Sequence, residues 1–143
     1  MTLKFDRNRS NLCWRNCQQI GDHTHIFWDC PVLKTFWTGI QTEIHSILKV
    51  NLPLNPLYYI LDLVPDGAMD KKKAHLVSIL LLIARKMITI CWLKPLPPTI
   101  HQWKERLKTV FLMEKITAKL HCRLIPFLTL WAPVINHLNL SSK

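Results

Sequence analysis

The segment from Cys13 to Cys30 constrains this chain more than any other part of its sequence. It holds three thiols and one imidazole, in the order Cys13-x3-Cys17-x7-His25-x4-Cys30. Such a short segment cannot bury a core of its own, and a tetrahedral Zn²⁺ with sulfur and nitrogen ligands supplies the missing folding free energy. The pattern therefore predicts a CCHC zinc knuckle with one structural Zn²⁺ bound by Cys13, Cys17, His25 and Cys30.

His23 is the alternative imidazole ligand, because it lies two residues before His25. Its use would shorten the first loop of the knuckle and lengthen the second. Either choice gives four protein ligands and leaves no coordination position for a catalytic water, so the site is predicted to be structural rather than hydrolytic. The alternative to a zinc site is a set of reduced core cysteines.

The charge of the chain favours an anionic partner. The chain has nineteen Lys and Arg but only nine Asp and Glu, which gives a formal net charge of +10. Zinc knuckles most often contact nucleic acid, so RNA or single-stranded DNA is the predicted partner. The alternative is a solvated basic surface without a specific partner.

Candidate nucleic-acid contacts come from two places. Around the knuckle, aromatic rings could stack on unpaired bases and a guanidinium could bind phosphate; these residues are Trp14, Arg15 and Trp28. Farther along, lysines at helical spacing form one stripe, comprising Lys104, Lys108, Lys115 and Lys119, and Lys71, Lys72 and Lys73 are also candidates for phosphate contact. The alternatives are that Phe27 or Trp28 packs the knuckle onto the next helix, and that the lysines form a solvated face.

The cysteine count and the hydropathy pattern predict a reducing compartment. The chain has five cysteines, and an odd number argues against a framework of disulfide bonds. The first residues lack the apolar region of a signal peptide. No segment reaches the ~18 uncharged apolar residues of a membrane span. The expected location is cytoplasmic or nuclear, with no membrane partner.

The rest of the chain predicts helices. Residues 1–12 form a basic arm, 13–31 the knuckle and 32–140 a helical domain. Apolar residues recur every three or four positions after Pro31, in 71–93 after Asp70, and in 100–121 after a Thr99/Gln102 capping box. A last helix is expected from Pro126, interrupted at Pro133, and 57–61 is short and β-prone. The predicted fold is mainly α, with a small CCHC zinc knuckle packed on a bundle of four to five helices.

Three blocks of sequence carry a family resemblance. They are the Cys13–Cys30 pattern followed by Pro31 and Phe36-Trp37, the block ARKMITICWLKPLPPTIHQWKERLKTVFLMEKITA at 84–118, and FLTLWAPVINHL at 127–138. In this order they resemble the C-terminal segment of the second open-reading-frame protein, the reverse transcriptase protein, of vertebrate LINE-type non-long-terminal-repeat retrotransposons. The likeness covers roughly residues 12–140.

The resemblance implies a module that binds zinc and RNA or DNA and supports target-primed insertion. The chain contains no polymerase Tyr-x-Asp-Asp or Phe-x-Asp-Asp motif and no endonuclease residue set. We therefore expect no enzymatic activity, and a chain that corresponds to a detached tail of the family protein. Two alternatives are a helical scaffold that docks on the polymerase part of the parent protein, with zinc purely structural, and a retrotransposon remnant without function.

Overall fold

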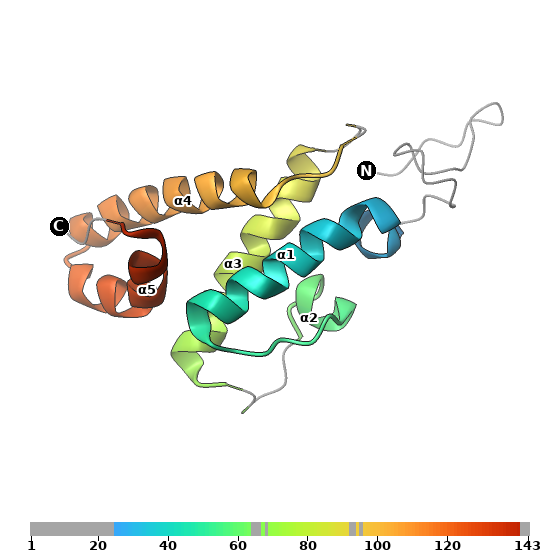
Figure 1. The fold of residues 1–143 in the computed structure, drawn as a ribbon. Helices are drawn as coiled ribbons and strands as arrows, with labels where there is room; N and C mark the ends of the chain where they lie inside the picture. The colour runs from blue at the N-terminus through green and yellow to red at the C-terminus, as the bar shows by residue number, and fades with distance from the viewer. Residues whose placement is uncertain (1–24, 64–66, 68, 92–93, 95, 141–143) are drawn as a thin grey trace.

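The structure is a computed structural model that describes residues 25–63, 67, 69–91, 94 and 96–140. These residues form one π-helical turn and five α-helices, without a strand among them (Figure 1). The elements are η1 (His25–Asp29), α1 (Pro31–Leu48), α2 (Pro56–Tyr59), α3 (Lys71–Ile90), α4 (Ile100–Leu120) and α5 (Leu124–Leu138). The prediction of a mainly helical chain is confirmed, whereas the arm at 1–12 and most of the predicted knuckle lie outside the described residues.

The long helices begin where their capping residues predict. The Asp70 carboxylate accepts a hydrogen bond of 2.8 Å from the Lys73 backbone N–H at the start of α3. At the start of α4, the Thr99 hydroxyl accepts from the Gln102 N–H and the Gln102 side chain accepts from the Thr99 N–H, at 3.1 and 3.0 Å. Both caps occupy backbone donors that a helix leaves unpaired at its first turn.

Two predicted features differ in the structure. Of the β-prone residues 57–61, the first three belong to α2, because the Asn55 side chain caps the Leu57 N–H at 2.9 Å and Pro56 fits the first helical position. The last helix begins at Leu124, before Pro126, and continues through Pro133. A helix-interior proline costs about 3 kcal/mol, and the burial of Trp131 and Val134 beside it offsets that cost.

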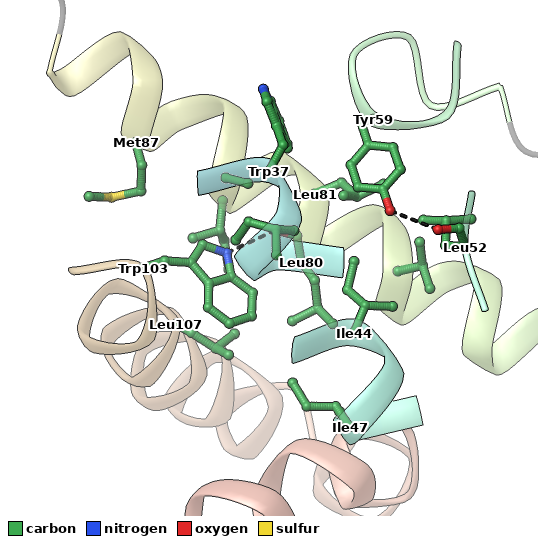
Figure 2. Packing of buried hydrophobic residues seen from close by; sticks show 14 of the residues in the cluster. Trp37, Ile44, Ile47, Leu52, Tyr59, Leu80, Leu81, Met87, Trp103 and Leu107 are labelled. Atoms are coloured by element: carbon green, nitrogen blue, oxygen red, sulfur yellow. Dashed lines mark hydrogen bonds between the residues drawn. The ribbon is translucent and has the colours of Figure 1, made fainter. Parts of the chain in front are cut away.

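Helix α3 lies at the centre of the core and packs against α1, α4 and α5. Its buried side chains cover several faces and include Leu76, Val77, Leu80, Leu81, Ile83, Ala84, Met87 and Ile88. Figure 2 shows Trp103 of α4 directed toward Leu80, with Ile44 and Ile47 of α1 nearby. No helix among the described residues is long and apolar enough to cross a membrane.

Gly39 of α1 lies close against Ile100, the first residue of α4. A Cβ atom at this position would lie 2.6 Å from both Cδ1 and Cγ1 of Ile100. We expect Gly39→Val to lower the free energy of unfolding by about 1–3 kcal/mol, because the added atoms overpack this contact. Urea denaturation of Gly39→Val, Ile100→Ala and the double variant measures the coupling. The double variant should lose less than the sum of the two single losses, and strict additivity would contradict the contact.

Candidate metal and nucleic-acid site

Cys30 is the predicted zinc ligand that joins the knuckle to the helical body. It is the N-cap residue of α1, with extended backbone geometry, and its side chain is fully buried. Its carbonyl accepts a 2.9 Å hydrogen bond from the Leu33 N–H. The turn η1 begins at His25 and ends directly before Cys30. Because a π-helix pairs residue i with residue i+5, the backbones of His25 and Cys30 lie one turn apart.

Aromatic residues hold η1 against the helical body. The indole N–H of Trp37 donates a 2.8 Å hydrogen bond to the Phe27 carbonyl. The Trp28 ring lies 5.4 Å, between centroids, from both Trp37 and Tyr59. The half-buried Trp28, proposed as a base-stacking residue, is therefore packed on the core, which supports the packing alternative for this residue.

Tyr59 links this aromatic cluster to two further segments. Its hydroxyl donates to the Leu52 carbonyl at 3.0 Å, and its own carbonyl accepts from the Arg85 guanidinium at 2.9 Å (Figure 2 shows the first bond). Burial raises the pKa of the Tyr59 phenol, so the neutral, donating form persists at ordinary pH. Burial also lowers the pKa of Arg85, and the nearby Asp62 carboxylate opposes that shift. These interactions connect α2, the residue Leu52 and α3 to the aromatic residues that pack against η1.

The structure does not describe three of the candidate zinc ligands. Cys13, Cys17 and His23 lie outside the described residues, as do the predicted contacts Trp14 and Arg15. Within the described part of the chain, no group of three or more His, Cys, Asp or Glu side chains forms a metal site. The zinc site therefore stays a prediction.

The lysines of the predicted α4 stripe lie in different surroundings. Lys115 is only 6% exposed, and its ammonium lies 5.7 Å from the centroid of the Phe111 ring. Lys104 forms a 3.1 Å ion pair with Glu43 of α1, and Lys108 forms a 3.2 Å pair with Glu105. Burial makes Lys115 a poor candidate for phosphate contact, and ion pairs already engage Lys104 and Lys108. Lys119, the fourth member of the stripe, is exposed.

A better candidate for phosphate contact is the first turn of α3. Lys71, Lys72 and Lys73 occupy it in succession, with no acidic residue in that turn. The N-terminus of a helix carries partial positive charge, so lysines there oppose the macrodipole and each costs a few tenths of a kcal/mol or more. The same combination of positive charges attracts an anion. These lysines were recognised in the sequence, but their position at a helix start gives them more weight than the α4 stripe.

No sequence pattern pointed to Glu43, which lies at the junction of three helices. Its two carboxylate oxygens lie 3.1 Å from Lys104 Nζ of α4 and 3.0 Å from His137 Nε2 of α5. The three partners are far apart in the sequence, so no local pattern could have paired them.

No protein-family model matches this chain.

Proposed function

We propose that this chain is a zinc-dependent module that binds RNA or single-stranded DNA. In this proposal it corresponds to the C-terminal part of a LINE-type reverse transcriptase protein, acts in the cytoplasm or nucleus, and performs no catalysis of its own. The observation that carries the proposal is the position of Cys30. The last residue of a CCHC pattern is buried at the start of α1, one π-turn after His25.

The donor set suits a structural Zn²⁺. Three thiolates and one imidazole at short spacings are the ligands of closed tetrahedral zinc sites. Bound there, the metal would cross-link the segment that precedes η1 to the helical body. The packing of Trp28 on Trp37 and Tyr59 supports this role, because it fixes the residues between His25 and Cys30 against α1.

Native mass spectrometry of the full chain, before and after a chelator, tests the zinc site. We expect one Zn²⁺ per chain, lost in Cys30→Ser and retained in the control Cys122→Ser, whose thiol is exposed outside the pattern. His25→Ala should lose the metal and His23→Ala should keep it; the reverse result would identify His23 as the ligand. A wild-type chain without zinc after refolding in zinc would refute the site.

Unpaired positive charge supports the nucleic-acid part of the proposal. Lys104, Lys108 and His137 form ion pairs with carboxylates. Ten exposed or half-exposed cations make no such pair; they are Lys34, Lys49, Lys71, Lys72, Lys73, Lys86, Lys94, Arg106, Lys119 and Arg123. This surplus is suited to phosphate groups.

Fluorescence anisotropy with a labelled single-stranded oligonucleotide, at increasing KCl, tests binding. Each phosphate neutralised on a single strand contributes about 0.7 to the slope of log K against log salt. We therefore expect Lys71→Gln/Lys72→Gln/Lys73→Gln to reduce the slope by about 2, whereas the ion-paired control Lys108→Gln leaves it nearly unchanged. Binding that is absent near physiological salt, or that has no salt dependence, would refute nucleic-acid binding.

A protein-interaction scaffold is the second candidate. The observation that favours it is an exposed apolar strip on the C-terminal half of α4, formed by Leu112, Met113, Ile116 and Leu120. These side chains are between 56% and 78% exposed. Exposed apolar patches of this kind mark sites of association. A chain that stays monomeric at high concentration and does not bind the polymerase part of the family protein would count against this candidate.

A further inference from the structure

A groove of about 440 Å³ lies between α3, α4 and α5, and none of its lining residues belongs to η1, α1 or α2. Its floor is apolar and includes Ile83, Phe127 and Trp131, of which Ile83 and Trp131 are buried. Leu82 stands on its rim and is 47% exposed. The groove therefore combines a preformed apolar floor with apolar surface that water still reaches.

The walls of the groove are two helix faces. One wall comes from α3 and is formed by positions 75, 79, 82 and 86. The other wall comes from α4 and is formed by positions 106, 110 and 114. Steps of three and four residues keep side chains on one face of a helix. With a rise of 1.5 Å per residue, the α3 wall extends for about 16 Å, or three helical turns. This length matches a short helix better than a compact small molecule.

The charges at the rim are separated along the groove. Lys86 lies near the end of α3 and Arg106 near the start of α4, and these two ends are joined by residues 91–99. Glu114 of α4 and His75 of α3 lie farther from that connection, toward the other end. Among the described residues, neither cation nor Glu114 forms an ion pair. The groove thus has one cationic end and one end that carries a carboxylate.

We propose that this groove binds a short amphipathic helix from another protein. Apolar residues of that helix would enter the floor, its acidic residues would meet Lys86 and Arg106, and a basic residue would meet Glu114. Helix-in-groove recognition uses apolar anchors at these spacings. A nucleic-acid strand fits the groove less well, because its phosphates would meet Glu114 and would leave the apolar floor uncovered. The inference does not depend on zinc or on the lysines in the first turn of α3.

Three synthetic peptides of about fourteen residues, roughly four helical turns, are the probes. The first has leucines at i, i+3, i+4 and i+7, two glutamates at one end and lysine at the other. The second has lysines at both ends, and the third has the composition of the first with the leucine spacing scrambled. In fluorescence anisotropy, we expect the first peptide to bind about tenfold more tightly than the second, because two opposite-charge contacts replace two like-charge contacts. The scrambled peptide should not bind measurably.

Charge reversal in the protein provides the decisive comparison. Lys86→Glu/Arg106→Glu should reverse the order of the first two peptides, whereas the matched control Lys34→Glu/Lys119→Glu, on exposed cations outside the groove, should keep it. Circular dichroism confirms that each variant is folded, and the reversal itself cannot arise from unfolding. Equal binding of all three peptides, or no binding by any, would overturn the proposal. Displacement of the first peptide by single-stranded RNA would also overturn it, as would self-association that Lys86→Glu/Arg106→Glu abolishes.

Discussion

Replacement of Trp103 with alanine is expected to lower the free energy of unfolding by about 3–5 kcal/mol, the usual range for a fully buried tryptophan. Trp103 has no exposed surface and lies at the junction of α4 with the central helix α3. Its indole N–H donates a 3.2 Å hydrogen bond to the Leu80 carbonyl. The substitution removes both the apolar volume and this bond, so the two losses act in the same direction.

Urea denaturation, followed by circular dichroism, measures the effect. Trp103→Phe should cost less than alanine, because it keeps most of the ring volume and loses only the indole donor. His101→Ala is the matched control, since His101 lies in the same first turn of α4 with its side chain exposed. A loss below about 1 kcal/mol for Trp103→Ala would contradict the packing of α4 on α3.

The elements that could be predicted from the sequence depend on neighbouring residues. The starts of α3 and α4 follow from Asp70 and from the Thr99/Gln102 capping box, whose interactions lie within one turn. Pro31 likewise marks the start of α1. Apolar spacing likewise predicted the helix at α3. Such signals do not depend on how the helices later pack.

Two differences between the sequence predictions and the structure depend on tertiary packing. The lysine stripe on α4 follows correctly from helical spacing, but spacing alone does not show how far a neighbouring helix covers the stripe. Lys115 lies one turn after Phe111 and is covered, because a lysine can bury its aliphatic stem against apolar surface. Pro133 was expected to interrupt the last helix, whereas the burial of its neighbours keeps α5 continuous. For the candidate zinc site, the sequence supplied the ligands, and the structure added the buried position of Cys30.

Reversal of the charge at Glu43 is expected to destabilise the fold nearly as much as the loss of Trp103. The Glu43 side chain is 16% exposed and contacts two basic groups, Lys104 at 3.1 Å and His137 at 3.0 Å. Glu43→Lys would place a third basic group at the junction of α1, α4 and α5. Breaking a buried ion pair costs about 3–5 kcal/mol. Because Lys104 and His137 are about one third exposed or less, we expect a loss near the lower end of that range.

The chain contains its own control for this reversal. Glu105 pairs with Lys108 on the surface of α4, where both side chains are more than 40% exposed. An exposed pair contributes about 0–1 kcal/mol, so Glu105→Lys should change the unfolding midpoint little. Addition of Lys104→Glu to Glu43→Lys restores opposite charges across α1 and α4 and should recover part of the stability. Equal losses for Glu43→Lys and Glu105→Lys, measured by urea denaturation, would show that Glu43 does not hold the three helices together.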